Sequence, residues 1–425
     1  MLATIADELT HRNYGDEVRL EIAHNCPEEM VNFLRDQCAM QQENVYLVNG
    51  PVNLSRLQTL HSMVERSDLK FKPFTQGRPT GLTSDADIFD LLKQKDVLLH
   101  HPYQSFTPVI DLIKQAAADS SVLAIKQTLY RTGAISPIVD ALVAAAHAAN
   151  VALASKLQQA GAHVVYGIVG YKTHAKMLLI LRRENNKLRR YVHLGTGNYH
   201  RNTSRIYTDY GLLTSDKQIG EDVNNLFIQL TSLGKIPKMH KLMHAPFNLH
   251  QGLLDKIDRE IAHAEAGKAA HIIIKVNAVV EPEMIQALYR ASIAGVKVDL
   301  IVRGICTLKP GVEGISDNIQ VRGIIGRFLE HTRVFYFENA GDIEVWAGSA
   351  DLMKRNLLRR VETCFPIESK RLQKRIIADL NLYLADNTQA WILSADGRYQ
   401  RAARKEGDEM ISAQTALLEE LAKTI

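Results

Sequence analysis

Two polar residues, His174 and Lys176, open an apolar run in the segment GYKTHAKMLLILRR, residues 170–183. In a β-strand, residues i and i+2 project from the same face, so we expect these two side chains to lie together. A neutral imidazole is a good nucleophile toward phosphorus, and a neighbouring ammonium group would offset the charge on the phosphoryl oxygens. The pair therefore predicts a phosphoryl-transfer site where a buried strand begins.

The same arrangement occurs a second time in the chain. LEHTR and the apolar stretch VFYFE repeat the pattern with His331 and Arg333, and the two copies then reach small-residue turns, LGTGN and AGSAD. A lone His-x-Lys is usually a surface pair, but recurrence within a repeat favours a functional interpretation. If the copies face each other about a pseudo-twofold axis, one histidine can attack while the other protonates the leaving oxygen.

Further cations indicate an anionic substrate. Arg131 ends the expected strand LAIKQTLYR and Arg303 ends KVDLIVRG, so both lie where α/β sheets bind ligands. A guanidinium group matches phosphate oxygens with two parallel hydrogen bonds, although a solvated strand end is an equal alternative for either arginine. Tyr207 in RIYTDYGLLT could stack on a base or fill the interior. The charged segment RRENNKLRRY is typical of a solvated hairpin tip.

An internal repeat sets the expected fold class. SVLAIKQTLYR followed by IVDALVAAAHAANVALA resembles HIIIKVNAVVE followed by MIQALYRASIAGVKVDLIV, which aligns Lys126 with Lys275 and Val151 with Val296. Each copy predicts a strand, an amphipathic helix and another strand. We therefore expect an α/β architecture that is built twice.

The expected divisions follow from this repeat. Residues 1–72 form a smaller unit with the loop GRPTGLTSD as its exit, residues 73–240 form the first copy, and residues 241–425 form the second. The second copy ends in two expected helices, KRLQKRIIADLNLYLAD and MISAQTALLEELAKT.

Composition argues against several classes of protein. With 46% hydrophobic and 23% charged residues among 425, the chain is typical of a globular protein, and a net charge of +4 does not require nucleic acid. The four cysteines have neither disulfide nor zinc spacing, and the acidic N-terminus does not predict a signal peptide. The most apolar window is interrupted by Asp140 and His147, so we expect no membrane span. GxxxxGK[ST], GxGxxG after a strand, GxSxG and HExxH are all missing.

Several motifs in order resemble one known family. KTHAK, HLGTGN, IYTDYGLLT, LIVRGIC, EGISDN and FLEHTRVFYFENAG are similar to polyphosphate kinase of the phospholipase D-like type, which moves the terminal phosphate of ATP onto a polyphosphate chain. The resemblance runs from DVLLHHPYQSF nearly to the end. It implies two tandem phospholipase D-like α/β domains, preceded at residues 19–72 by the remnant of a small α+β head domain.

The resemblance also implies roles for individual residues. By motif, His174 would become the phosphohistidine and His331 would be the general acid and an ATP contact. Tyr207 and Arg303 would contact the nucleotide. Arg131 falls at the family's magnesium and phosphate site. Because arginine has no lone pair for a metal, we expect it to hold a phosphate that Mg²⁺ also binds during in-line transfer.

Two departures from the family pattern bear on activity. The family's helical N-terminal domain, with an ATP-binding asparagine, would precede the start of this chain. The family's Glu-Leu-x-Ala-Arg-Phe-Asp-Glu stretch, in a strand-helix connection of the first copy, is also absent. Here the segment NVALASKLQQAGAHV passes directly from the expected strand to the next expected helix. The repeat shows the same gap, because Val296 precedes His331 by 35 residues whereas Val151 precedes His174 by only 23. Loss of a phosphate-holding arginine there could slow transfer greatly, because misplacement alone costs about a hundredfold.

Three functions remain open from the sequence. The first is a polyphosphate kinase that acts on ATP, ADP and polyphosphate, impaired by these departures. The second is a phospholipase D-like phosphodiesterase, which Arg333 and Asp351 disfavour because that class has lysine and asparagine there. The third is an inactive relic that binds polyphosphate. We expect a homo-oligomer without a nucleic-acid partner and a cytoplasmic location, with peripheral membrane association left open.

Overall fold

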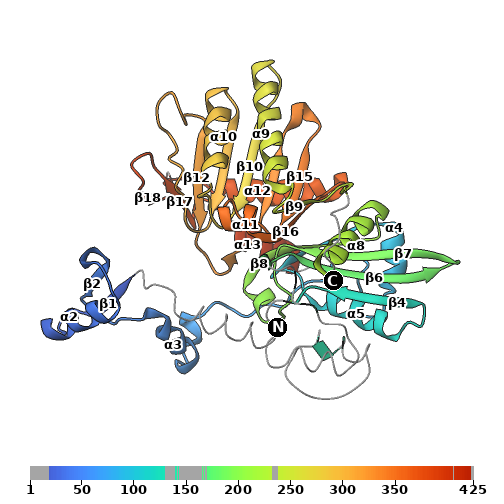
Figure 1. Cartoon of the computed structure of the whole chain (residues 1–425), viewed down its shortest axis with the longest axis horizontal. Helices are drawn as coiled ribbons and strands as arrows, with labels where there is room; N and C mark the ends of the chain where they lie inside the picture. The colour runs from blue at the N-terminus through green and yellow to red at the C-terminus, as the bar shows by residue number, and fades with distance from the viewer. Residues whose placement is uncertain are drawn as a thin grey trace. The chain divides into compact units, whose positions relative to one another are not determined.

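The protein is described by a computed structural model that covers residues 19–129, 139–140, 142, 165, 167, 170–231, 238–404 and 406–422. The chain separates into two compact units, residues 1–73 and 74–425 (Figure 1). None of the helices within these described ranges has the length and apolar character that crossing a membrane requires.

The smaller unit contains a βαβ motif. Its described elements are β1 (Leu20–Ala23), α2 (Glu28–Gln37), β2 (Val45–Val48) and α3 (Gln58–Met63). Strands β1 and β2 are parallel, with Leu20 opposite Val45, and α2 supplies the crossover that a parallel pair needs.

The first half of the larger unit is built around a six-stranded sheet. Its elements are α4 (Ile88–Gln94), β3 (Val97–His101), α5 (Thr107–Ala118), β4 (Val122–Gln127), β5 (Lys172–Thr173), β6 (Lys176–Glu184), β7 (Lys187–Gly195), β8 (Tyr207–Thr214) and α8 (Lys217–Thr231). The sheet order is β13-β8-β7-β6-β4, with β3 antiparallel to β8. The predicted hairpin tip is confirmed between β6 and β7, where Asn185 and Asn186 adopt the positive φ that a tight turn requires.

The second half repeats this plan around a ten-stranded sheet. Its elements are β9 (Met243–Ala245), α9 (Leu249–Glu265), β10 (His271–Val276), α10 (Pro282–Ile293), β11 (Lys297–Val302), β12 (Ile319–Ile324), β13 (Leu329–Glu330), β14 (Val334–Phe337), β15 (Glu344–Gly348), α11 (Lys354–Leu358), β16 (Arg360–Pro366), α12 (Lys370–Ala385), β17 (Ala390–Leu393), β18 (Tyr399–Arg401) and α13 (Ala413–Ala422). The order is β18-β17-β12-β11-β10-β14-β15-β16-β5, with β9 antiparallel to β16. Both predicted C-terminal helices are present as α12 and α13.

Pairing within the two sheets confirms the internal duplication. In the first sheet, β4 pairs with β6, β6 with β7 and β7 with β8. In the second sheet, β10, β14, β15 and β16 are neighbours in the corresponding order. Lys126 lies in β4 and Lys275 in β10, as the repeat predicts. Most residues of the first copy between 130 and 169, including Val151 and Arg131, lie outside the described residues.

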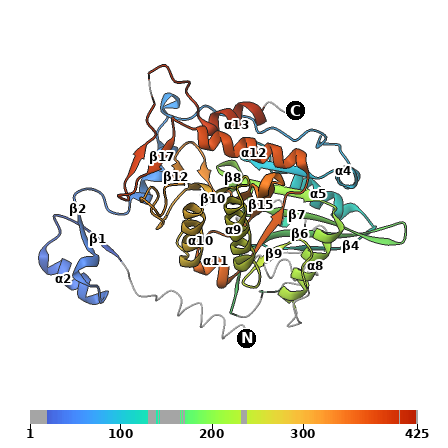
Figure 2. The same ribbon diagram turned by 90° about the horizontal axis from the view of Figure 1, so that it is seen from above.

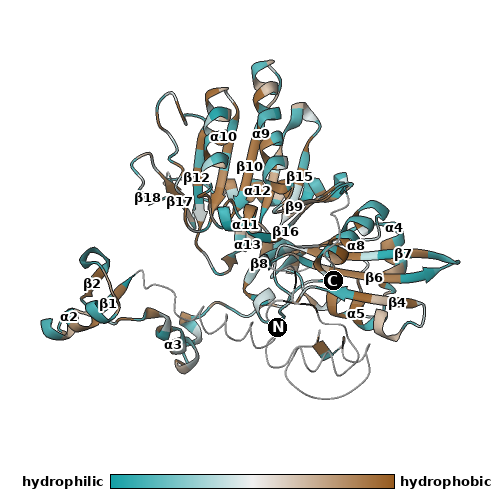
Figure 3. Cartoon of the chain, viewed as in Figure 1, coloured by the Kyte–Doolittle hydropathy of each residue, from teal (hydrophilic) through white to brown (hydrophobic). Residues whose placement is uncertain are grey.

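Helices cover the sheets in layers that share apolar cores. Helices α4 and α5 pack on one face of the first sheet, and α9 and α10 pack on one face of the second. A third core lies between the two sheets and combines residues of both with α8, α12 and α13. Figure 2 shows the places of these three helices. The apolar residues of α12 recur every three or four positions, for example Leu372, Ile376 and Leu380, which places them on one buried face. In Figure 3 the hairpin end of β6 and β7 is hydrophilic, whereas β10 between its helices is hydrophobic.

Two very short strands cross from one sheet to the other. Strand β5 belongs to the first copy by sequence but pairs in parallel with β16 of the second. Strand β13 belongs to the second copy but pairs in parallel with β8 of the first. The two copies are therefore joined by a reciprocal exchange of strands as well as by a common core.

Stability against acid is predicted to depend on Glu344 at the start of β15. Its carboxylate accepts from Lys256 at 2.6 Å and from Arg259 at 2.5 Å. Although burial alone would raise the pKa of Glu344, these hydrogen bonds lower it to about 2. The folded pKa therefore lies below the ordinary value, so this carboxylate stabilises the fold above pH 4.5 and the stabilisation is lost as pH falls toward 2.

Glu344→Gln should lower the free energy of unfolding by about 1–2 kcal/mol at pH 7, and the difference from the unchanged protein should vanish near pH 2–3. Urea unfolding across this pH range checks the expectation. Asp258→Asn is the matched control, because Asp258 pairs with Arg290 where both side chains are 54% exposed. A constant difference from pH 2 to pH 7 for Glu344→Gln would contradict the prediction.

Candidate active site

The two motif histidines lie where the chain crosses between sheets. His174 and Ala175 stand between β5 and β6, and both of their backbone N–H groups donate to the Val361 carbonyl, at 2.8 and 2.9 Å. His331 similarly follows β13, and its N–H donates to Thr208 Oγ1 at 3.1 Å. The prediction that His174 and Lys176 share one strand is therefore wrong, because β6 begins only at Lys176. The same holds for His331 and Arg333, since β14 begins at Val334.

A carboxylate from the second copy orients His174. Nδ1 of His174 lies 2.9 and 2.8 Å from the two carboxylate oxygens of Glu362 in β16. Glu362 is fully buried and also accepts from Ser349 Oγ at 2.5 Å and from Asn356 Nδ2 at 2.6 Å. Burial lowers the pKa of His174, and the hydrogen bond to Glu362 opposes this shift. The imidazole is thus held by an anion that is itself fixed by neutral donors.

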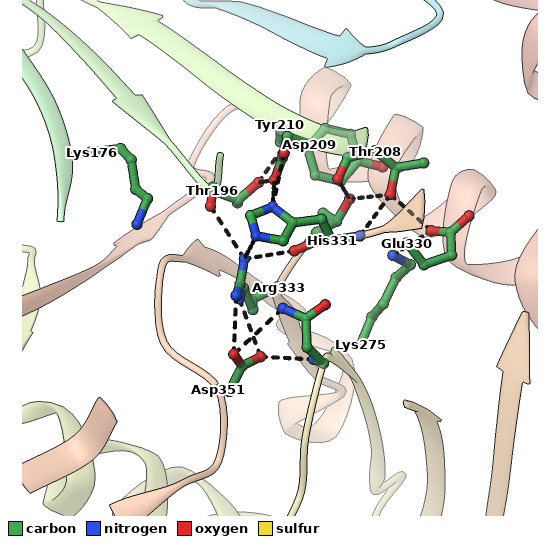
Figure 4. A network of polar contacts seen from close by, with 12 residues as sticks. Lys176, Thr196, Thr208, Asp209, Tyr210, Lys275, Glu330, His331, Arg333 and Asp351 are labelled. Carbon is green, nitrogen blue, oxygen red and sulfur yellow. Dashed lines mark hydrogen bonds and ion pairs between the residues drawn. The ribbon is translucent and has the colours of Figure 1, made fainter. Parts of the chain in front are cut away.

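A carboxylate from the first copy orients His331 in the same way. Nδ1 of His331 lies 2.8 and 2.9 Å from the oxygens of Asp209 in β8. Asp209 also accepts from Thr196 Oγ1 at 2.6 Å (Figure 4). Although burial raises the pKa of Asp209, the neighbouring His331 and Arg333 bring it below the usual value. Thr196 and Ser349 occupy matching places in the two small-residue turns, so the two histidines have equivalent supports.

Arg333 stabilises the second histidine from the other side. Its guanidinium group binds Asp351 through Nε at 3.2 Å and Nη2 at 3.0 Å, and Nη1 lies 3.0 Å from Nε2 of His331 (Figure 4). Because a guanidinium group only donates, Nε2 of His331 accepts and the ring is neutral. Burial lowers the pKa of His331 to about 4, and the Arg333 charge acts in the same direction.

Lys176 brings a buried cation between the two histidines. It is 2% exposed, and its ammonium group donates to the His174 carbonyl oxygen. Burial lowers its pKa to about 7, which the charge of Glu362 opposes. Lys176 also lowers the pKa of His331, while Arg333 lowers that of His174. Each cation acts on the histidine of the other copy, so the two motifs form one electrostatic site.

The predicted nucleotide contacts lie around His331. Arg303 directly follows β11, where burial and then Arg333 lower its pKa. The ring of Tyr207 at the start of β8 has its centroid 5.3 Å from that of His331. The structure thus brings Arg303 and Tyr207 to the His331 side of the site. Arg131, the fifth predicted site residue, lies outside the described residues.

The described part of the site does not fit a resident metal ion. Across the described ranges, no three side chains of His, Cys, Asp or Glu come together as a metal would require. The carboxylates at the centre already bind side chains of the protein: Glu362 binds His174, Asp209 binds His331, and Asp351 binds Arg333. The described residues present cations for an anionic ligand instead.

Several functional residues escaped the motif search. Asp209 lies about thirty residues after the first His-x-cation motif, and Glu362 lies about thirty residues after the second. Each acid binds the histidine of the other copy: Asp209 binds His331, and Glu362 binds His174. The repeat contains the signal, because TDY in β8 aligns with VET in β16, and the acid follows a threonine in the first copy and a valine in the second. Sequence spacing alone could not show that the partners are exchanged.

Comparisons with known proteins agree with this architecture. Three family models match: "Polyphosphate kinase middle domain" over residues 1–60, "Polyphosphate kinase C-terminal domain 1" over 87–149 and 147–236, and "Polyphosphate kinase C-terminal domain 2" over 242–414. The chain is 52% identical to polyphosphate kinase of Pseudomonas aeruginosa over 435 residues, which covers 98% of this chain and 63% of that protein. It is likewise 52% identical to polyphosphate kinase of Neisseria gonorrhoeae over 433 residues, with the same two coverages.

A solved structure provides a third comparison. The crystal structure of polyphosphate kinase from Porphyromonas gingivalis superposes with a TM-score of 0.85 at 31% identity, covering 96% of this chain and 65% of that one. The chain thus spans less than two thirds of the length of these relatives. The matches to all three domain models, and the similarity along nearly the whole chain, show that it belongs to the polyphosphate kinase family.

Proposed function

We propose that this chain is a polyphosphate kinase, which transfers the terminal phosphate of ATP reversibly to inorganic polyphosphate through a phosphohistidine on His174. The observation that carries this proposal is the reciprocal pairing of His174 with Glu362 and of His331 with Asp209 around buried cations. Two oriented imidazoles and a cationic cluster suit transfer of a phosphoryl group between two anionic chains.

The hydrogen bond to Glu362 prepares His174 for attack. A carboxylate that accepts at Nδ1 keeps the proton on that nitrogen and leaves the lone pair on Nε2. The low pKa of His174 favours the neutral ring, which is the nucleophilic form. Nε2 would bond to the terminal phosphorus of ATP while the bond from that phosphorus to the bridging oxygen breaks, and ADP would leave with the bridging oxygen. The terminal oxygen of polyphosphate would then attack phosphorus and release His174.

Charge is balanced around this transfer by groups already in place. The ring of His174 becomes positive when its nitrogen bonds to phosphorus, and Glu362 lies 2.8 Å from Nδ1 to stabilise that charge. Lys176 and Arg333 would face the oxygens of the transferred group. Both cations are buried, at 2% and 3% exposure, where charge interactions are stronger than in water.

In the absence of bound phosphate, His331 would have no proton to donate from Nε2. It would contact ATP, and it would become a general acid only once phosphate is bound. With Arg333 donating to Nε2, the ring has no proton there to give. A bound phosphate chain would compete for Arg333 and raise the pKa of His331 from about 4. Tyr207 and Arg303 would bind the nucleotide on this side, with the tyrosine ring stacked near the base.

Other parts of the proposal rest on the family. The division at residues 72 and 240 is supported by matches over 1–60, 87–236 and 242–414. One family model matches in two segments, residues 87–149 and 147–236, which supports the missing loop, so transfer should be slow. A Mg²⁺ ion would enter as part of the Mg-ATP substrate, with Arg131 near its phosphates. A homo-oligomer, a cytoplasmic location and the absence of nucleic acid stay predictions.

The first test is transfer of label from Mg-ATP labelled in its terminal phosphate. Acid-labile label should appear on the protein and move to added polyphosphate, and His174→Ala should abolish both. His240→Ala is the control, because His240 is 47% exposed and pairs only loosely with Glu221 at 3.6 Å. Equal labelling of His174→Ala would refute the assignment. Polyphosphate binding without any label would indicate a relic, and hydrolysis of a diester without ATP would indicate a phosphodiesterase.

Removing the charge of Glu362 should slow phosphorylation of His174 while the fold persists. In Glu362→Gln the amide no longer stabilises the positive ring, and we expect labelling to slow by about 10²–10⁴-fold. Rapid-quench measurement of labelling checks this expectation. Glu368→Gln, a few residues further on and 50% exposed, should label at the normal rate. A Glu362→Gln rate within threefold of normal would show that Glu362 does not orient the nucleophile.

The affinity for polyphosphate should depend on pH through Lys176. Because its pKa is about 7, the ammonium charge is present below pH 7 and is lost as pH rises above it. Binding of long-chain polyphosphate, measured by calorimetry from pH 6 to pH 9, should therefore weaken across this range. Lys176→Arg keeps its charge throughout and should flatten the dependence. An unchanged slope in Lys176→Arg would assign the pH dependence to another group.

A further inference from the structure

The C-terminal helix α13 contacts the segment that leads into His331. Gln414, in the first turn of α13, is 2% exposed. Its side-chain oxygen accepts from the Phe328 N–H at 2.9 Å, and its NH₂ group donates to the Phe328 carbonyl at 2.8 Å. The same NH₂ group donates to Glu330 Oε1 at 2.6 Å. One amide thus makes three hydrogen bonds to the residues just before the histidine.

The carboxylate of Glu330 is the next part of this network. Besides the bond from Gln414, it accepts from Lys275 Nζ at 2.7 Å and from Thr208 Oγ1 at 2.9 Å. Figure 4 shows Glu330 beside Lys275 and Thr208. Glu330 and Lys275 are 3% and 2% exposed, so they form a buried ion pair, and Thr208 and Gln414 donate further hydrogen bonds to the carboxylate. Lys275 Nζ also lies 4.9 Å from the ring centroid of Tyr383 in α12.

Thr208 connects the carboxylate to the backbone of His331. Its hydroxyl donates to Glu330 and accepts from the His331 N–H at 3.1 Å. The next side chain, Thr332, donates to the Thr208 carbonyl at 3.0 Å. A continuous chain of buried hydrogen bonds therefore runs from Gln414 through Glu330 and Thr208 to the main chain at His331.

The first copy does not repeat this arrangement. Thr173 stands where Glu330 stands in the second copy, and Lys126, the counterpart of Lys275, binds Asn224 Oδ1 at 3.2 Å instead. Among the residues of the first copy that the structure describes, His174 thus lacks the glutamate and lysine pair that precedes His331.

The start of α13 is itself fixed to the fold. The Asp386 carboxylate, which follows α12, accepts from the Ala413 N–H at 2.8 Å and from the Gln389 N–H at 2.7 Å. Gln414 is the next residue, so its amide is presented from a helix end that Asp386 anchors to the fold.

We propose that Gln414 is a positioning residue for His331, acting through Glu330 and Thr208 to hold the imidazole between Asp209 and Arg333. The inference deepens the proposed function, because it makes the C-terminal helix part of the machinery that orients the second histidine. Gln414 itself touches neither His331 nor a reacting atom.

Titration of the His331 ring by NMR tests the proposal without requiring activity. Gln414→Met keeps the length of the side chain but removes all three hydrogen bonds. The His331 pKa should rise from about 4 toward its ordinary value of 6.5, because a loosened ring gains water. The charged groups that face the ring, Asp209, Arg333 and Lys176, are unchanged in this variant. The kcat for polyphosphate synthesis should fall about 10–100-fold.

The matched control is Gln373→Met on helix α12. Gln373 is also buried, at 7% exposure, and donates to the Ile367 carbonyl at 2.8 Å, remote from the segment before His331. The Gln373→Met variant should lower the free energy of unfolding without changing the pKa of His331. If Gln414→Met leaves the His331 pKa unchanged, or if Gln373→Met raises it equally, the positioning role is refuted.

A second pair of variants covers the case in which Gln414→Met does not fold. Thr208→Val removes the hydroxyl that joins Glu330 to His331, whereas Thr208→Ser keeps it. Only Thr208→Val should raise the His331 pKa, and equal behaviour of the two would overturn the proposal. A shifted titration in a protein that never transfers phosphate would leave the positioning role standing and refute the kinase assignment alone.

Discussion

The pairing of each motif histidine with a carboxylate from the opposite copy is the constraint on which the structure depends. His174 needs Glu362, and His331 needs Asp209, so neither copy contains a complete centre. Strands β5 and β13 cross to the opposite sheets and bring the histidines within reach of these acids. The apolar core that combines residues of both sheets then fixes the crossing. The duplication and the geometry of the candidate site are therefore parts of the same arrangement.

Burial makes this polar centre costly, and its neighbours offset the cost. A charge that is removed from water is tolerated only when partners satisfy it. Glu362 has three different donors, and Arg333 is fixed by two hydrogen bonds to Asp351. Lys176 is also buried, and burial brings its pKa to about 7. A phosphate chain bound beside Lys176 would favour its charged form.

The two halves of the site are similar in plan but differ in chemistry. The cation of the motif is lysine in the first copy and arginine in the second, and Arg333 contacts a ring nitrogen of His331. Only the second copy has the buried ion pair of Glu330 with Lys275. Tyr207 and Arg303 also gather on the His331 side. A pseudo-symmetric fold can therefore give its two histidines different surroundings, because substitutions around a shared strand order change the groups that contact each ring.

The sequence by itself determined the repeat, the α/β class, the hairpin tip, the two C-terminal helices and the two histidines. These features depend on local spacing and on similarity between segments, which are visible along the chain. It placed His174 and Lys176 wrongly in one strand, because spacing cannot show that a strand is divided between two sheets. Only the tertiary structure decided which carboxylate serves which histidine. Such contacts join residues more than a hundred positions apart, and strand exchange, which no local pattern encodes, brings them together.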